Sequence, residues 1–213
     1  MKTSCDVRKI SAAKPEADAV ESAVQIIERG GVIVFPTTGL YGLGANALHA
    51  DAVNRIFRIK ERPSHRPILL LIADFADLNR LVLEVPASAL QLIRTFWPGG
   101  LTLVFQAGDT LPTALTGGSG KIGIRLPVHP VARALVKRLG GPLTGTSANL
   151  SGGPGCSDIA NLDAAVAANV DLILDAGPLK GGVGSTVVDV TAGKPVILRE
   201  GAISEPQILA AIA

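Results

Sequence analysis

The chain has 213 residues, of which 47% are hydrophobic, and its formal net charge is +2. This length supports one substantial core, or two small ones at most, and the small net charge excludes a protein that is basic over its whole surface. Only 3% of the residues are aromatic, which argues against a stacking platform for single-stranded nucleic acid.

Cysteine and histidine are too scarce to suggest a disulfide framework or a zinc cluster, with two and three residues in the whole chain. No N-terminal apolar run resembles a signal peptide, and no apolar stretch approaches the length of a membrane span. We therefore expect a cytoplasmic protein without membrane contact. Residues 1–14 are polar and predict a flexible N-terminal segment, followed by a single domain over residues 15–213.

Helical and strand-like patterns alternate irregularly along the chain. Apolar residues at helical spacing predict helices over 15–29, 51–60, 74–82, 86–96, 131–139 and 162–168. Short apolar runs predict strands over 32–35, 68–72, 101–105, 121–125, 143–146 and 172–174. A hairpin is expected around Ala192-Gly193, and Ser204-x-x-Gln207 is a capping box for a last short helix. Because crossover and hairpin links are mixed, we expect an α/β fold with a mixed sheet.

The stretch from Gly30 to Arg66 combines features of a binding site. A buried strand leads into a glycine-rich turn over 37–44, and a helix follows with Asp51 as its predicted N-cap. The outer face and the end of this helix carry a cluster of cations that includes Lys60 and Arg62. Neither the dinucleotide fingerprint nor a Walker lysine is present. A solvated helix face is the alternative, but we favour a site for a polyanionic small ligand.

Several motifs occur together in a defined order. They are Pro36-Thr37-x-x-x-Tyr41-Gly42-Leu43, Lys60-x-Arg62-Pro63, Trp97-Pro98-Gly99, Arg125-x-Pro127, Thr146-Ser147-x-Asn149-x-Ser151-Gly152, Ser185-Thr186-Val187 and Leu198-Arg199-x-Gly201. This set resembles the YrdC family of L-threonylcarbamoyladenylate synthases from about residue 16 to residue 203. The chain stops soon after the last motif, so it resembles the short form of the family, without an additional C-terminal domain.

The resemblance implies both a fold and a reaction. The fold would be a YrdC-like single domain, with a twisted mixed sheet and flanking helices around a large basic cavity. The reaction would convert L-threonine, bicarbonate and ATP, with Mg²⁺, into L-threonylcarbamoyladenylate and pyrophosphate. This is the first step of the threonylcarbamoyl modification of adenosine 37 in ANN-decoding tRNAs. A tRNA threonylcarbamoyl transferase complex would be the partner, and tRNA itself could bind.

The resemblance also implies roles for individual residues. Lys60 and Arg62 would clamp the triphosphate, where fixed cations offset the repulsion between anions and the charge that develops in phosphoryl transfer. Matching family positions assign ATP binding to Ser147, Asn149 and Arg199. Matching positions also assign L-threonine binding to Thr37, Arg125, Gly145 and Ser185. No protein side chain is assigned to a metal.

The sequence allows two alternative hypotheses about function. A non-catalytic module could bind tRNA or double-stranded RNA through the same basic cavity, although the low net charge and few aromatics disfavour it. A carbamoyl-transfer domain of the hydrogenase-maturation type would be expected within a longer chain, beside acylphosphatase-like or zinc-finger segments. The chain departs from the family pattern at Thr38-Gly39 and at His65-Arg66, and both departures leave substrate selectivity open.

Overall fold

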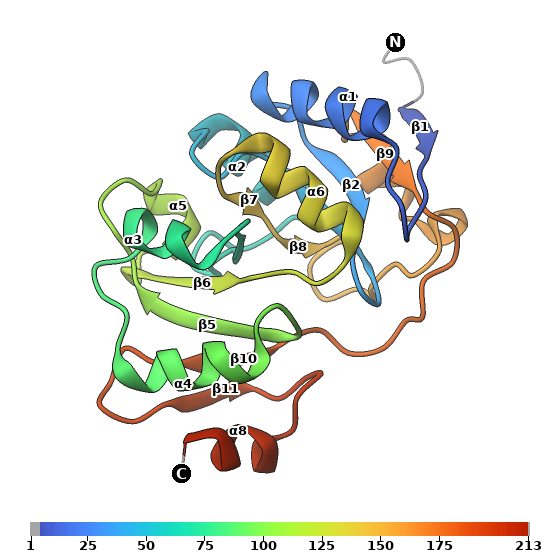
Figure 1. Cartoon of the computed structure of the whole chain (residues 1–213). Helices are drawn as coiled ribbons and strands as arrows, with labels where there is room; N and C mark the ends of the chain where they lie inside the picture. The colour runs from blue at the N-terminus through green and yellow to red at the C-terminus, as the bar shows by residue number, and fades with distance from the viewer. Residues whose placement is uncertain (1–4, 213) are drawn as a thin grey trace.

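The structure, a computed structural model, describes residues 5–212. Within this range the strands form two mixed sheets with helices packed against them (Figure 1). The predicted class, a single mixed α/β domain, is confirmed, but the strands divide into two sheets and do not form one. Among the described residues, no helix is both long enough and apolar enough to cross a membrane.

Sheet A has five strands in the order β1-β9-β2-β3-β8. Strands β1, β9 and β2 run parallel, and β3 and β8 continue the sheet antiparallel. Its strands are β1 (Asp6–Lys9), β2 (Ile33–Pro36), β3 (Tyr41–Gly44), β8 (Thr146–Ser147) and β9 (Leu172–Asp175). The central strand β2 is buried along its whole length, as its apolar run predicts.

Sheet B has six strands in the order β11-β10-β5-β6-β4-β7. Parallel pairing joins β10 to β5 and β6 to β4, and the remaining pairs are antiparallel. Its strands are β4 (Leu70–Leu71), β5 (Leu101–Gln106), β6 (Lys121–Arg125), β7 (Leu143–Thr144), β10 (Thr186–Asp189) and β11 (Val196–Arg199). The predicted hairpin is confirmed, because β10 and β11 flank Ala192-Gly193 and pair antiparallel.

Helices pack against both sheets. They are α1 (Ala17–Glu28), α2 (Ala50–Ile59), α3 (Leu78–Leu81), α4 (Ala87–Phe96), α5 (Thr113–Thr116), α6 (Pro130–Leu139), α7 (Ala164–Ala167) and α8 (Glu205–Ile212), with 3-10 turns at Phe75–Asp77 and Ile159–Asn161. Helices α1 and α6 contact each other and β2, and α4 contacts α8 (Figure 1). The predicted inner face of α1, with Val20, Val24 and Ile27, is buried in the core cluster that also contains Ile33.

The chain passes from one sheet to the other at Gly145. The segment 143–146 was predicted as one strand, but β7 pairs with β4 in sheet B and β8 pairs with β3 in sheet A. Gly145 lies between them and donates its amide to the carbonyl of Leu69 at 2.8 Å. A Cβ at this position would lie 2.8 Å from Leu69 Cδ1 and 2.9 Å from Leu71 Cγ. The crossing therefore needs a residue without a side chain.

Three local predictions need correction. Residues Asp6–Lys9, within the segment predicted to be flexible, form the edge strand β1 on β9; residues 1–4 of that segment lie outside the described range. Helix α2 is capped by His49, whose Nδ1 accepts from the amide of Ala52 at 3.4 Å, and not by Asp51. The second half of the predicted glycine-rich turn is strand β3, so the true turn is only 37–40. Gly42 and Gly44 lie in this strand, where their missing side chains let Phe35 pack closely.

Thr186 joins β10 to the segment that leads into α8. Its buried hydroxyl donates to the carbonyl of Ile203 at 2.5 Å and accepts from the amides of Gly201 and Ile203 at 2.9 Å each. Replacing Thr186 by valine keeps the shape but leaves three backbone groups, two of them in buried bonds, without this partner. We expect the free energy of unfolding to fall by about 2–3 kcal/mol.

Urea unfolding of the Thr186→Val variant measures this effect. Thr110→Val is the matched control, because the Thr110 hydroxyl makes a single bond in an exposed position, to the carbonyl of Arg80. The control should stay within about 0.5 kcal/mol of the unsubstituted protein. Equal unfolding midpoints for the two variants would contradict the role assigned to Thr186.

Candidate active site

A cavity of about 930 Å³ is lined by residues of both sheets. Its volume is within the range of small-molecule sites. Sheet B contributes alternate residues of β5, β6 and β10, and sheet A contributes the turn after β2 and the residues of β8. Eight of the nine residues that the sequence assigns to a site line this cavity: Thr37, Arg62, Arg125, Gly145, Ser147, Asn149, Ser185 and Arg199. The ninth, Lys60, does not.

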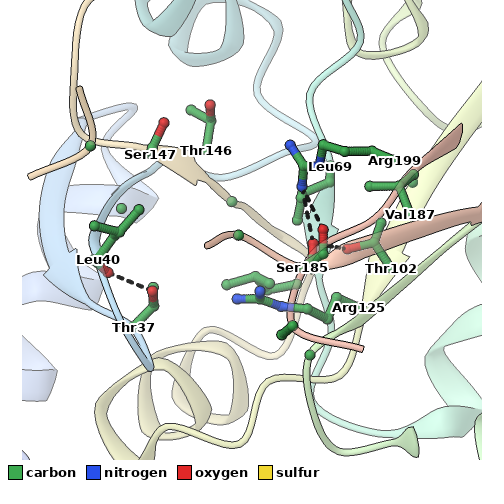
Figure 2. A pocket seen from close by; sticks show the side chains of 18 of the residues that line it. Thr37, Leu40, Leu69, Thr102, Arg125, Thr146, Ser147, Ser185, Val187 and Arg199 are labelled. Atoms are coloured by element: carbon green, nitrogen blue, oxygen red, sulfur yellow. Dashed lines mark hydrogen bonds between the residues drawn. The ribbon is translucent and has the colours of Figure 1, made fainter. Parts of the chain in front are cut away.

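Arg125 is the most unusual group in the cavity. Its Nε is buried and has no hydrogen-bond partner, and its guanidinium forms no ion pair with any described residue. Burial, together with repulsion from Arg199, lowers the pKa of Arg125 to about 10, so the side chain is still a cation at neutral pH. In Figure 2 the guanidinium points into the open space on the side of Thr37. A partly buried cation without a carboxylate partner that faces a cavity predicts an anionic ligand.

Hydroxyl groups lie beside this cation. Ser185, just before β10, is buried, and its Oγ is 2.7 Å from the Oγ1 of Thr102 on β5. Arg199 donates from Nη2 to the carbonyl of Ser185 at 2.7 Å, which holds β11 against the same point (Figure 2). Strand pairing brings these groups together: in the register of β5 and β10, Thr102 lies opposite Val187, which follows Ser185 by two residues. The group can hydrogen-bond a small polar ligand held by Arg125.

The turn 37–40 forms the opposite wall of the cavity. Thr37 donates its hydroxyl to the carbonyl of Leu40 at 2.5 Å (Figure 2). Gly39 accepts from the amide of Gly181 at 3.0 Å, and a Cβ on Gly39 would lie only 2.3 Å from the carbonyl oxygen of Gly181. Two turns distant in sequence therefore touch backbone to backbone, which only glycine at position 39 permits.

Lys60 lies behind the loop that carries Ser147 and Asn149. Only 1% of the residue is exposed, and its ammonium donates to the carbonyls of Ser147 and Asn149 at 2.5 and 2.7 Å. The backbone carbonyl of Lys60 also accepts from the amide of Ser151 at 2.8 Å. The Lys60 side chain therefore lies outside the cavity lining: it holds a loop that faces the cavity, and that loop comes 87 residues later in the chain.

The charge state of Lys60 reflects two opposing effects. Burial, and then the charge of Arg62, lower the pKa of the ammonium to about 8. The two carbonyls that accept from Nζ favour its protonated form. At neutral pH the ammonium is therefore present, and its hydrogen bonds hold the loop. The loop is braced further by the Ser147 hydroxyl, which donates to Oδ1 of Asn149.

Arg62 lines the cavity as expected. Its Nε donates to the carbonyl of Arg66 at 3.1 Å, and its Nη2 donates to the carbonyl of Pro67 at 2.8 Å. Burial, followed by the charge of Arg66, lowers the pKa of this guanidinium. Because only backbone carbonyls hold Arg62, its positive charge is not neutralised and remains available to an anion.

The cavity has a strongly positive lining. Five cationic side chains line it among the described residues: Arg62, Lys121, Arg125, Lys180 and Arg199. One carboxylate, that of Asp189, lines it as well, and it pairs with Lys121 at 2.8 Å. Within residues 5–212 the cavity therefore has more cationic than anionic side chains in its lining. No group of three or more His, Cys, Asp or Glu in that range could hold a metal ion.

Sequence reasoning missed several lining residues. The Lys121–Asp189 pair joins positions 68 residues apart, and only the alternation that places Lys121 and Arg125 on one face of β6 hinted at it. Thr102 is a hydroxyl inside an apolar strand, which was an available signal. The Tyr41 hydroxyl donates to the carbonyl of Gly177 at 2.7 Å and fixes the start of the loop after β9. No local pattern could reveal that contact.

Curated relatives match most of the chain. The threonylcarbamoyl-AMP synthase of Pyrococcus abyssi is 38% identical over 189 residues, which is 89% of this chain and 56% of the relative. The threonylcarbamoyl-AMP synthase of Bacillus subtilis is 39% identical over 194 residues, 91% of this chain and 56% of the relative. The chain thus spans about half the length of these two relatives. The putative threonylcarbamoyl-AMP synthase of Mycobacterium tuberculosis is 37% identical and is covered over 87% of its length.

Solved structures agree with this relationship. The crystal structure of P. abyssi Sua5 complexed with L-threonine has a TM-score of 0.89 and 36% identity to this chain. The match covers 97% of this chain and 60% of the Sua5 chain. The crystal structure of Escherichia coli YciO has a TM-score of 0.87 and 32% identity, and the match covers 95% of this chain and 99% of the YciO chain. The Sua5/YciO/YrdC family model, described as telomere recombination, matches residues 25–201. The chain therefore belongs to the Sua5/YciO/YrdC family.

Proposed function

We propose that the chain is an L-threonylcarbamoyladenylate synthase, which makes threonylcarbamoyl-AMP and pyrophosphate from L-threonine, bicarbonate and ATP. The observation that carries this proposal is the unpaired guanidinium of Arg125, with its buried Nε, beside the hydroxyls of Ser185 and Thr102. The names of the curated relatives support it, and so does the similarity to a Sua5 structure that contains L-threonine.

L-Threonine would bind between the two sheets. Its carboxylate would pair with Arg125, because a guanidinium offers two parallel N–H donors to a carboxylate. Ser185 and Thr37 supply hydroxyl partners from opposite walls. Gly145 also lines the cavity, at the point where the chain crosses between the sheets.

The nucleotide would occupy the part of the cavity lined by Ser147 and Asn149, with Arg199 also within reach of it. Arg62 would contact the phosphates, since its charge is not neutralised by a carboxylate. We propose that Lys60 contributes by holding the loop of Ser147 and Asn149, as its buried ammonium is already bonded to the carbonyls of both residues. Mg²⁺ would enter as part of the substrate, bound to phosphate oxygens of ATP.

The reaction explains why unpaired cations are needed. The threonine amine and bicarbonate form a carbamate with loss of water, and a carbamate oxygen then attacks the α-phosphorus while pyrophosphate leaves. Two anions approach each other and a third departs, so fixed positive groups stabilise the transition state more than they stabilise separated reactants. A cavity lined by five cationic side chains and one carboxylate provides such fixed positive groups.

The product would serve tRNA modification in the cytoplasm, where a tRNA threonylcarbamoyl transferase complex would consume it. Direct tRNA binding without catalysis is the second candidate. The cations exposed near the end of α2, such as Arg58 and Arg66, are the surface feature that it would use. Arg55 on the same helix is not free for RNA, because it pairs with Asp171 at 2.5 Å. The enclosed position of Arg125 favours the synthase.

Pyrophosphate release tests this proposal. With Mg²⁺ and ATP present, release should require both L-threonine and bicarbonate, because the nucleophile forms only from the two together. The assay omits each component in turn and uses bicarbonate-free buffer as the blank. ATP turnover that persists at the same rate without threonine or without bicarbonate would indicate a plain ATPase and would overturn the synthase assignment.

A further inference from the structure

One cation of the cavity has no role in the site described above. Lys180 lies in the loop between β9 and β10 and is exposed, yet it lines the cavity. Among the described residues it forms no hydrogen bond and no ion pair. Lys121, by contrast, is neutralised by Asp189. Lys180 is therefore a free ammonium at the cavity wall.

The loop that carries Lys180 is fixed to the rest of the protein before and just after it. The Tyr41 hydroxyl holds Gly177, the amide of Leu179 donates to the carbonyl of Ser157 at 2.7 Å, and the amide of Gly181 donates to Gly39 at 3.0 Å. These contacts keep the Lys180 backbone next to the turn 37–40. The ammonium, at the end of a four-carbon stem, can still reach different positions over the cavity.

The remainder of the loop has few constraints. Gly181 and Gly182 have φ angles of +70° and +104°, which side chains rarely adopt, although a Cβ on either would meet nothing within 4 Å. Glycine is thus required there by the backbone path and not by lack of space. Val183 follows, 71% exposed although it lines the cavity. A ligand that extends to this side would cover an apolar side chain and meet the Lys180 ammonium.

We propose that Lys180 is a further substrate-binding residue, which contacts the polyphosphate of ATP and the pyrophosphate product. This inference rests on the proposed function. Arg125 satisfies the carboxylate of threonine, and Arg62 and Arg199 are two cations for a triphosphate that carries about four negative charges before Mg²⁺ binds. Lys180 supplies a third. A lysine suits phosphate because its point charge needs no fixed orientation, so it can follow pyrophosphate as it leaves.

Binding measurements on four variants test the proposal. Lys180→Ala, Lys180→Arg and Lys180→Glu change the charge in steps, and Lys194→Ala removes an exposed lysine that lies on the β10–β11 turn, outside the cavity. Titration calorimetry gives the Kd of magnesium pyrophosphate and of L-threonine. We expect Lys180→Ala to raise the pyrophosphate Kd about five- to tenfold, between the effects of exposed and enclosed charge pairs. Lys180→Arg should stay within about twofold, and Lys180→Glu should exceed the alanine variant.

The threonine Kd should stay within about twofold in every variant, and Lys194→Ala should change neither Kd, because a change at one exposed surface position is usually small. A pyrophosphate Kd unaffected by Lys180→Ala would overturn the proposal. So would equal losses of pyrophosphate and threonine binding, which would indicate a structural role for the loop. Adenylate formation by the unsubstituted protein is measured separately. Its absence would refute the proposed function, while the pyrophosphate titrations would still decide whether Lys180 binds phosphate.

Discussion

Replacing Arg125 by methionine is expected to reduce kcat/KM for threonine about a hundredfold or more without destabilising the ligand-free protein. The variant removes a charge-assisted contact worth about 1.5–3 kcal/mol for each hydrogen bond to a charged group, and each 1.36 kcal/mol changes a rate tenfold. The same substitution removes a partly buried guanidinium whose buried Nε has no partner. An unpaired buried charge costs stability, so the thermal midpoint without ligand should be equal or higher.

Pyrophosphate assays and thermal unfolding, each with and without L-threonine, measure both effects. Threonine should raise the unfolding temperature of the unsubstituted protein and leave that of Arg125→Met unchanged, because a ligand stabilises only the state it binds. Arg133→Met is the control, since Arg133 is exposed on α6 and lies outside the cavity. If Arg125→Met still responded to threonine as the unsubstituted protein does, Arg125 would not hold the carboxylate.

Replacing Lys60 by methionine is expected to reduce both activity and stability. The ammonium satisfies the buried carbonyls of Ser147 and Asn149, so its loss should lower the free energy of unfolding by about 1–3 kcal/mol. The loop would then lose its fixed position, and kcat/KM for ATP should fall by about one to two orders of magnitude. Arg62→Met should lower activity by a similar factor with little loss of stability, because Arg62 lies at the cavity wall.

Urea unfolding measures the stability of Lys60→Met and Arg62→Met, and ATP-dependent pyrophosphate release measures their activity. Together the two measurements distinguish the roles of the two residues. The expected loss of stability at Lys60 follows from its buried contacts with the loop, which Arg62 does not share. If Lys60→Met were as stable as the unsubstituted protein yet had lost ATP binding, Lys60 would contact the triphosphate directly and the loop-anchoring role would be refuted.

The sequence predicts the fold well where its signals are local. The apolar run before Pro36, the helical spacing of Val20, Val24 and Ile27, and the capping box at Ser204 each identify an element that the structure contains. The division into two sheets could not be predicted, because it depends on which partners β7 and β8 find on either side of Gly145. Edge strand β1 was missed because its four residues, three of them polar, show no buried face.

The candidate site follows the same pattern. Motifs distant in sequence were assigned to one site, and the structure brings eight of the nine residues to one cavity. The position of Lys60 could not be predicted, since a lysine at a helix end looks the same whether it faces solvent or a loop 87 residues away. The Lys121–Asp189 pair and the free ammonium of Lys180 depend likewise on strand pairing and loop paths. Neither strand pairing nor the path of a loop can be predicted from the local sequence around these residues.

The most direct test of the synthase assignment is to identify the product by mass spectrometry. The unsubstituted protein is incubated with Mg²⁺, ATP, L-threonine and ¹³C-bicarbonate. The assignment predicts an adenylate that contains both the threonine and the labelled carbon, formed in equal amount with pyrophosphate and strongly reduced when Arg125 is replaced by methionine. Formation of AMP or ADP without any threonine-containing adenylate, or an adenylate without the labelled carbon, would contradict it.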